Sequence, residues 1–232
     1  MFLEAPEEYV EEIYISEDFL MFLESQEDGG KRVREKLDEK GYETVSRDVF
    51  AKMSDTQAPQ GILCVVRQRS YELGDMLKGE KNPLFLVLEN LQDPGNLGTI
   101  LRSGEGAAAS GIVMSRDTVD LYNPKVIRAT MGSVYRVPFC YVEDLETAVD
   151  QMKKAGIEVF AAHLEGEKSY DKCDYRTGSA FLIGNEGNGL TERISLLADV
   201  RIKIPMEGKV ESLNASVAAS LLAFEAARQR RG

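Results

Sequence analysis

Residue types that build metal sites and disulfide frameworks are scarce in this chain of 232 residues. The only histidine is His163, so a metal site with more than one histidine ligand is excluded. Cys64, Cys140 and Cys173 are odd in number and far apart, which is typical neither of a disulfide framework nor of a metal cluster. We therefore predict no bound metal and a reducing, cytoplasmic compartment.

Long hydrophobic runs and a basic N-terminus are also missing. No apolar run approaches the roughly 20 residues that a membrane-spanning helix needs. The N-terminus shows no basic segment followed by an apolar one, so we expect no signal peptide. Residues 1–30 contain no lysine or arginine, and the chain carries a formal net charge of −11. This charge argues against non-specific nucleic-acid binding, so an RNA partner would require a local basic patch.

The segments that are present alternate between strand-like and helix-like patterns in two parts. Residues 1–75 predict a small α/β domain, with Ser16 placed to cap a helix. A polar stretch around Gly79 and Pro83 marks a boundary, and we take residues 76–83 as a linker. Residues 84–232 then predict a second and larger domain.

The second part has the pattern of an α/β fold. Apolar segments predict strands at 84–89, 111–114, 157–162, 179–184 and 200–204. Helices are expected between and after them, at 97–109, 124–131, 143–154, 189–197 and 212–229. Alternation at this spacing predicts a mostly parallel sheet with helices on both faces. Ligands of such sheets bind beyond the carboxyl ends of the strands, where three unusual loops fall.

The first loop, NLQDPGNLGTILR, covers residues 90–102. Asn96 is well suited to cap a helix that starts near Leu97. Gly98, Arg102 and Gly106 are four residues apart and share one face of that helix. Because glycine costs about 1 kcal/mol relative to alanine in a helix, these glycines indicate that a backbone or a ligand approaches closely. The alternative is a tightly packed helix with one surface arginine.

The second and third loops are also unusual in composition. Residues 184–190, GNEGNGL, follow a strand in the order G-x-x-G-x-G, which is neither a dinucleotide-binding turn nor a P-loop, and we interpret them as a ligand loop. Residues 204–214 lead into a last helix rich in alanine and serine, which indicates a buried helix or a subunit interface. We expect Val217, Leu221 and Phe224 to supply its core side chains.

These three loops, in this order, resemble the SpoU (TrmH-like) branch of the SPOUT RNA methyltransferases. The matching stretches are NLQDPGNLGTILRSGEGAAASGI, VDLYNPKVIRATMGSVYRVP, FLIGNEGNGL and IPMEGKVESLNASVAASLLAFEAARQR. The likeness covers residues 84–231. Upstream, SDTQAPQGILCVV resembles part of the RNA substrate-binding domain of the family, although family members often begin with a basic segment and this chain begins with acidic residues.

The resemblance implies a C-terminal trefoil knot that binds S-adenosylmethionine, methyl transfer to a ribose 2′-hydroxyl of RNA, and a homodimer. The spacing of the residues alone does not predict a knot, because knots are nearly absent among folds. By position, the cofactor would be bound by Gly184, Asn185, Gly187, Ile204, Met206, Ser212 and Leu213. We expect Ser212 also to cap the last helix.

The candidate catalytic residues are Arg102, which the resemblance matches to catalysis, and Asn96, Glu186 and Asn214, which are polar residues of the same loops. A guanidinium is always protonated, so we favour Arg102 as the group that grips the phosphate beside the target ribose, rather than as the base. Asn96 would shape the loop or meet the substrate, and Glu186 is the alternative proton acceptor. Glu105, one turn beyond Arg102, is expected to pair with it.

Lys125, Arg128 and Arg136 are the candidates for contacts with RNA phosphates, and ordinary surface charge is the alternative. Ribosomal RNA is the favoured substrate because of the separate N-terminal domain, with transfer RNA as the alternative. Two other hypotheses remain: a non-catalytic RNA-binding or assembly factor with the same fold, and a nucleotide-dependent oxidoreductase, against which the glycine order argues.

Overall fold

The computed structural model describes residues 1–26, 30–54, 56 and 58–231. The chain forms two compact units, Met1–Arg69 and Ser70–Gly232, which are described separately. No helix in the described ranges is both long and apolar enough to cross a membrane.

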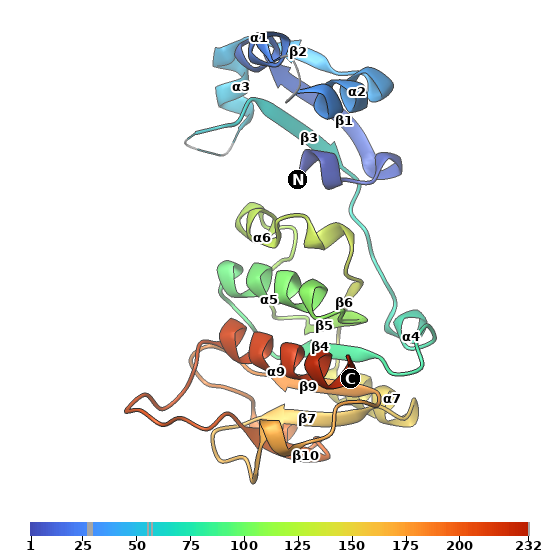
Figure 1. The fold of residues 1–232 in the computed structure, drawn as a ribbon, viewed down its shortest axis with the longest axis vertical. Coiled ribbons are helices and arrows are strands. Elements are labelled where there is room, and N and C mark those ends of the chain that lie inside the picture. The colour runs from blue at the N-terminus through green and yellow to red at the C-terminus, as the bar shows by residue number, and fades with distance from the viewer. Residues whose placement is uncertain (27–29, 55, 57, 232) are drawn as a thin grey trace. The chain divides into compact units, whose positions relative to one another are not determined.

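The first unit is a small α/β unit around a three-stranded sheet in the order β2-β1-β3 (Figure 1). Strand β1 pairs in parallel with β2 and antiparallel with β3. The bounds are η1 Phe2–Glu4, η2 Glu7–Tyr9, β1 Val10–Ser16, α1 Glu17–Ser25, α2 Lys31–Lys40, β2 Glu43–Val45, α3 Arg47–Met53 and β3 Ile62–Val66. Ser16 caps α1 as predicted, because its hydroxyl accepts a hydrogen bond from the backbone N–H of Phe19 at 3.3 Å.

The second unit contains a seven-stranded sheet in the order β6-β5-β4-β9-β7-β10-β8. Every neighbouring pair is parallel, which confirms the predicted parallel α/β architecture. The bounds are β4 Leu84–Leu88, β5 Gly111–Ser115, β6 Phe139–Val142, β7 Glu158–Ala162, β8 Lys168–Ser169, β9 Ser179–Ile183 and β10 Val200–Lys203. Strands β6 and β8 are not among the predicted strands, because both are short strands at the edges of the sheet.

The helices of this unit differ from the predicted ones mainly at their ends. Their bounds are α4 Leu73–Met76, α5 Pro94–Gly106, α6 Pro124–Thr130, η3 Ser133–Tyr135, α7 Leu145–Lys154, η4 Tyr170–Lys172, α8 Glu192–Ser195 and α9 Ala215–Arg230. Helix α8 is much shorter than the predicted helix 189–197, because the backbone of residues 185–189 closes on itself instead of coiling. Helix α4 forms just before the expected linker and ends at its first residue, and it buries Leu73.

The sheet is covered on both faces, as its uniformly apolar central strands require. Leu84, Leu86 and Leu88 of β4 belong to the hydrophobic cluster that contains residues of α5, α6 and α9. Phe85 and Val87 point to the opposite face and pack in the cluster of α7 and α8. Figure 1 shows α5, α6 and α9 on the near side of the sheet and α7 behind it.

Helix α9 packs through small residues and Leu222, not through the three large residues that the sequence suggests. Ala219, Ala223 and Ala226 are fully buried. The expectation that Val217, Leu221 and Phe224 fill the core is wrong, since they are 46%, 38% and 45% exposed. The alanine face lets α9 lie close to α5, and the Ser220 hydroxyl donates a hydrogen bond to that of Ser103 at 2.7 Å.

Helix packing also explains the glycines of α5. A Cβ at Gly98 would lie 2.4 Å from the Cβ of Ala129, so the backbones of α5 and α6 approach too closely for any other residue. A Cβ at Gly106 would lie 3.1 Å from the Phe224 ring of α9. Another element therefore approaches each glycine, as the close-packing alternative predicts.

Strand β10 lies between β7 and β8, which follow one another closely in the chain. Ile202 pairs with Ala162 of β7 on one side and with Lys168 of β8 on the other, so residues 163–167 span from one side of β10 to the other. A Cβ at Gly166 would lie 2.4 Å from the carbonyl carbon of Ile202 and 2.6 Å from the backbone nitrogen of Lys203. The crossing is therefore in backbone contact, and glycine is the residue that fits it.

Candidate functional site

The candidate site lies at the carboxyl ends of the central strands. Strands β5 and β6 extend the sheet on one side of β4, whereas β9 and β7 lie on its other side, so the order of the strands reverses at β4. Crevices at such reversals are the usual ligand sites of open α/β sheets. The loops after β7, β9 and β10 enclose a cleft of about 840 Å³, a volume typical of small-molecule sites. In Figure 1 the long loop after β10 extends from this edge of the sheet, at the left.

All residues that the resemblance assigns to the cofactor line this one cleft. They are Gly184, Asn185 and Gly187 from the loop after β9, and Ile204, Met206, Ser212 and Leu213 from the loop after β10. No backbone-to-backbone hydrogen bond involves residues 204–213 in the described part of the chain, so their N–H and C=O groups are available to a ligand. Cofactor binding by these seven residues stays a prediction.

The loop after β9 is closed by its own backbone. Asn185 and Gly189 exchange hydrogen bonds, with the Asn185 N–H to the Gly189 carbonyl at 3.0 Å and the reverse bond at 2.9 Å. A Cβ at Gly184 would lie 2.0 Å from the carbonyl carbon of Gly189 and 2.1 Å from the nitrogen of Leu190. Gly184 is therefore required for close backbone approach, and Gly189 for its φ of +67°.

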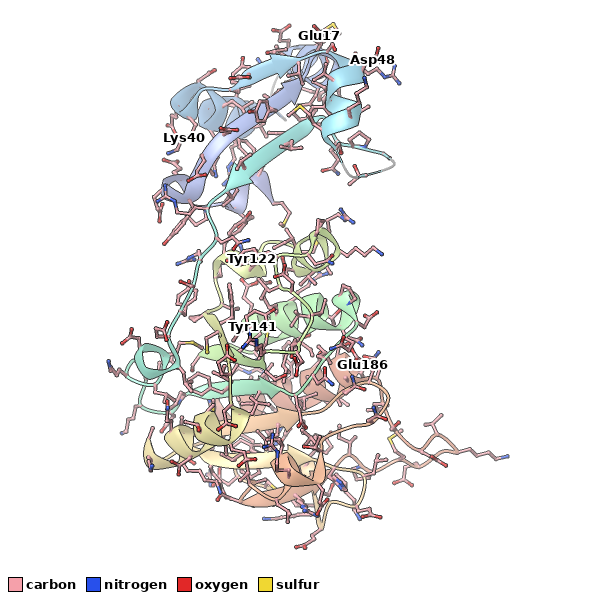
Figure 2. The ribbon with its side chains drawn as sticks, turned by 180° about the vertical axis from the view of Figure 1, so that it is seen from behind. Glu17, Lys40, Asp48, Tyr122, Tyr141 and Glu186 are labelled. Atoms are coloured by element: carbon pink, nitrogen blue, oxygen red, sulfur yellow. The ribbon has the colours of Figure 1, made fainter. Side chains whose placement is uncertain are left out.

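Glu186 extends from this loop to the first turn of α5, and Figure 2 labels it at that edge of the unit. Its carboxylate accepts hydrogen bonds from the backbone N–H groups of Gln92 at 3.1 Å and Asp93 at 2.9 Å. It also accepts one from the side-chain amide of Asn96 at 3.0 Å. Partial burial would raise the pKa of Glu186, but the hydrogen bonds from Asn96, Asp93 and Gln92 together lower it below the ordinary glutamate value.

Asn96 is buried inside α5, and its predicted role as the helix cap is wrong. The helix begins at Pro94, and its cap is Asp93, whose carboxylate accepts from the Asn96 N–H at 2.8 Å. This shift frees the Asn96 side chain for other partners. Its amide nitrogen donates to Glu186, and its amide oxygen accepts from the side chain of Asn214 at 2.9 Å.

Asn214, not Ser212, caps the last helix. The Asn214 amide oxygen accepts from the N–H and the hydroxyl of Ser216 at 2.8 and 2.6 Å. Since the other end of the same amide donates to Asn96, the order Glu186–Asn96–Asn214 joins all three predicted loops. These three of the four predicted catalytic residues are thus hydrogen-bonded to one another across 118 residues of sequence.

Arg102, the fourth, stands apart from this network. Its side chain is exposed and has no hydrogen bond or ion pair among the described residues. The expected pairing with Glu105 is wrong, because Glu105 forms an ion pair with Arg136 and accepts a hydrogen bond from Ser133. The hydrogen bond from Arg136 outweighs the effect of partial burial and, with that from Ser133, holds the pKa of Glu105 below its ordinary value. Arg102 is left available to an anion.

The three predicted RNA-contacting residues lie in or just after α6 and η3. Lys125 and Arg128 are exposed on α6, and no ion pair engages either of them within the described ranges. Arg136 is engaged with Glu105, with Nη2 at 3.1 Å from the carboxylate, so an RNA phosphate would compete with that ion pair. RNA contact by these residues stays a prediction.

Several polar residues around the site were not predicted from the sequence. Asp93 and Gln92 present the N–H groups that bind Glu186, and His163 lines the cleft. Glu89 is 9% exposed and accepts hydrogen bonds from Thr191, at the far end of the glycine-rich loop. The one available signal for Glu89 is a carboxylate directly after an all-apolar strand. No cluster of metal-ligating side chains occurs in the part of the chain that the structure describes.

The hydrogen bonds to Glu186 make stability depend on pH. Its folded-state pKa is depressed, so its contribution is fully present above the unfolded glutamate value of about 4.3 and is lost as pH falls through the lower folded value. We expect Glu186→Gln to be less stable than wild type at neutral pH, with a difference that shrinks in acid. Urea unfolding midpoints measured from neutral pH to about pH 3 test this. A difference that is constant with pH would contradict it.

A parallel sheet with a cleft at the carboxyl ends of its central strands defines an α/β protein that binds a small ligand at that edge. The model of the SpoU rRNA Methylase family matches residues 83–224, which is more than half of the chain. The chain therefore belongs to the SpoU rRNA methylase family.

Individual relatives agree with this assignment. The 23S rRNA (guanosine-2′-O-)-methyltransferase RlmB of Bordetella pertussis is 29% identical over 98% of this chain and 92% of its own length. The 23S rRNA (guanosine(2553)-2′-O)-methyltransferase RlmP of Bacillus subtilis is 31% identical over 78% of this chain and 70% of its own. The solved structure of the SpoU methyltransferase AviRb from Streptomyces viridochromogenes with AdoMet has a TM-score of 0.83 and 27% identity, over 100% of this chain and 87% of that chain.

Proposed function

We propose that this protein methylates a ribose 2′-hydroxyl of RNA with S-adenosylmethionine as methyl donor, and that ribosomal RNA is its substrate. The observation that carries the proposal is that the second and third loops line one cleft, while the hydrogen bonds of Glu186 and Asn214 to Asn96 join them to the first loop. Arg102 of that first loop has no protein partner within the described residues. Family membership supports the reaction, and the names of RlmB and RlmP support ribosomal over transfer RNA. We place the reaction in the cytoplasm.

The residues of the cleft fit S-adenosylmethionine. The free backbone groups of residues 204–213 suit the hydrogen-bonding edge of an adenine, and the apolar side chains of Ile204, Met206 and Leu213 suit its faces. The closed turn at residues 184–189 brings further backbone atoms to the cleft. When bound, this cofactor supplies a methyl group activated by an adjacent sulfonium.

Arg102 is the group that orients the substrate in this proposal. Its planar guanidinium presents a fork of donors that matches two oxygens of a phosphate, and no protein carboxylate competes for it within the described ranges. Gripping the phosphate next to the target ribose holds the 2′-oxygen in place, and positioning of this kind accounts for a large share of a transfer rate.

Glu186 acts as a positioning residue rather than as the proton acceptor. Both carboxylate oxygens already accept hydrogen bonds from Gln92, Asp93 or Asn96, and these bonds favour the charged form. A carboxylate with a lowered pKa is a weak base. Asn96 and Asn214 extend the same network and fix the loop after β10 relative to α5.

We further propose that the C-terminal segment forms the trefoil knot of the family. Residues 163–167 span β10, and the chain then returns as α9 to pack on α5. The last turn of α9 is fastened by Arg230, which donates to the carbonyls of Tyr175, Asn82 and Thr177 at 2.8, 2.9 and 2.7 Å. Threading of this segment through the crossing agrees with the backbone contact at Gly166.

The protein is expected to act as a homodimer through α9. Val217, Leu221 and Phe224 are spaced four and three residues apart, so their exposed side chains form one apolar stripe. We expect the pair of changes Leu221→Glu and Phe224→Glu to convert a dimer into a monomer by burying charge in the interface. Leu196→Glu, at a position 65% exposed beyond α8, is the matched control and should stay dimeric. Light scattering at micromolar concentration measures both, and a monomeric wild type would contradict the proposal.

Residues 1–75 are proposed as an RNA substrate-binding domain, and the basic contacts are proposed to come from the second unit. The first unit carries 16 acidic and 9 basic residues over positions 1–69, a net charge of −7. Phosphate binding across that unit is therefore unfavourable. Lys125 and Arg128 on α6 of the other unit, a helix packed against α5, provide cations that form no ion pair within the described residues.

The experiment that tests the function is transfer of labelled methyl from S-adenosylmethionine to separate pools of unmodified ribosomal and transfer RNA. Alkali cannot cleave next to a 2′-O-methylated ribose, so product RNA is hydrolysed and its dinucleotides are counted. Label in dinucleotides from ribosomal RNA is the expected result. Label confined to transfer RNA overturns the substrate. Cofactor binding without transfer to naked RNA or to assembling ribosomal particles would favour a non-catalytic assembly factor.

A further inference from the structure

The end of strand β4 holds the glycine-rich loop at both of its ends. Asn90, directly after Glu89, has the left-handed φ of 52°. Its carbonyl accepts a hydrogen bond from the Asn185 amide at 2.8 Å, at the start of the loop. The Glu89 carboxylate accepts from the N–H of Thr191 at 2.8 Å and from its hydroxyl at 2.7 Å, at the end of the loop.

Glu89 is buried, so its carboxylate needs hydrogen-bond donors from the protein. It is 9% exposed, and a buried carboxylate is costly unless donors satisfy it. Thr191 supplies two donors to the two carboxylate oxygens, and its hydroxyl also accepts from the Ile194 N–H at 3.3 Å. The Glu89 N–H donates to the Ile183 carbonyl at 2.9 Å, which extends the pairing of β4 with β9. Glu89 therefore joins the rigid sheet to the loop at its C-terminal end.

We propose that Glu89 is a positioning residue for the cofactor: through Thr191 it holds loop 184–190 in the shape that binds S-adenosylmethionine. This inference rests on the proposed function. Residues 186–189 of the loop are exposed, and its backbone pairing is one isolated antiparallel β-bridge between Asn185 and Gly189. Without the Glu89–Thr191 contact, the end of the loop would lose its link to the end of β4 and would be held by the burial of Leu190 and by the cap of α8. Glu89 itself is not among the residues that line the cleft, so it acts through Thr191 and not on the ligand.

The test compares Glu89→Ala, Thr191→Val and the double variant in the full chain. Hydrogen exchange of the free protein is measured first, and we expect faster exchange at residues 185–191 in all three variants. Calorimetric titration with S-adenosylmethionine should show a dissociation constant about 10-fold higher for Glu89→Ala and a smaller rise for Thr191→Val, which removes only the hydroxyl donor. Since Glu89→Ala already removes the hydrogen bond that Thr191→Val removes, the double variant should be no weaker than Glu89→Ala, instead of showing the product of the two losses.

A split between kinetic constants separates positioning from a general loss of structure. We expect the KM for S-adenosylmethionine to rise about 10-fold in Glu89→Ala while the kcat at saturating cofactor and the KM for RNA change less than about 3-fold. Glu89→Gln retains one acceptor oxygen and should fall between wild type and Glu89→Ala. Lys36→Met, which removes a buried hydrogen-bonding lysine from the first unit, is the control for lost stability and should leave cofactor affinity unchanged.

Two results would overturn the inference. One is that Glu89→Ala shows the same hydrogen exchange at residues 185–191 and the same cofactor affinity as wild type, while wild type binds the cofactor. The other is additive losses in the double variant, or equal losses of all kinetic constants. If wild type itself fails to bind S-adenosylmethionine, the proposed function fails, and the exchange data alone then show whether Glu89 still orders the loop.

Discussion

Replacing Arg102 by alanine is expected to reduce methyl transfer by at least about 10³-fold, with little change in cofactor affinity. The guanidinium is exposed and has no protein partner within the described residues, so its removal leaves no buried group unpaired. It also does not line the cleft proposed for the cofactor. The loss should therefore appear in turnover with RNA, and cofactor binding should stay within a few-fold of wild type. Single-turnover methylation and calorimetric titration measure the two effects separately.

Two variants sharpen this prediction. Arg102→Lys keeps the positive charge but loses the two-pronged donor geometry, so it should recover only a small part of the rate. Arg116→Ala is the matched control, because Arg116 is also an exposed arginine of the second unit and forms a surface ion pair with Glu143. It should be as active as wild type. Full activity of Arg102→Ala would remove Arg102 from the mechanism.

The second large effect is expected at Gly184. An alanine Cβ there would lie 2.0 and 2.1 Å from backbone atoms of Gly189 and Leu190, and neither backbone can rotate out of the way as a side chain could. The turn at residues 185–189 must therefore open. Because this turn forms one wall of the cleft, we expect Gly184→Ala to weaken S-adenosylmethionine binding by at least about 100-fold, which corresponds to about 2.7 kcal/mol.

The control for Gly184→Ala is Gly74→Ala. Gly74 lies in α4, and no atom lies within 4 Å of a Cβ placed there. Alanine is also the better helix former, so this variant should bind the cofactor as wild type does and unfold at an equal or higher temperature. Calorimetric titration and thermal unfolding of both variants are the measurements. Tight cofactor binding by Gly184→Ala would show that the loop needs neither this turn nor this glycine.

Much of the architecture follows from local patterns in the sequence. The apolar strands β4, β5, β7, β9 and β10 were predictable because a strand buried on both faces is apolar at every position. Ser16 was predictable as a helix cap because capping needs only a hydroxyl before a helical segment. The same local rule failed near Asn96 and Ser212, since two or three candidates stand side by side there. Asp93 and Asn214 are the caps because the two helices begin at Pro94 and Ala215, and the side chain of Asn96 binds Glu186 and Asn214 instead.

The candidate site, like the fold, was predictable from the sequence only in part. The glycines of the three loops and their positions after strands singled them out in the sequence, and the second and third of them line the cleft. The partners of individual side chains were not predictable. Spacing along the helix favoured an ion pair between Arg102 and Glu105. In the fold, Glu105 pairs instead with Arg136, which is 31 residues away in sequence. Likewise, the exposure of Val217, Leu221 and Phe224 depends on which face of α9 its neighbours cover. The face that carries the alanines is the buried one, because small side chains let α9 approach α5.

The sequence alone thus determined the parallel α/β class and the position of the three loops, because these depend on residue type and on order along the chain, and the family resemblance indicated seven of the residues that line the cleft. It was only the tertiary structure that decided that Arg102 has no partner within the described residues. Only the tertiary structure also decided that Glu186, Asn96 and Asn214 form one network and that Glu89 binds Thr191. Each of these contacts joins residues about a hundred positions apart. A hydrogen bond requires its two groups to meet within about 3 Å, and that meeting is set by the folding of the whole sheet.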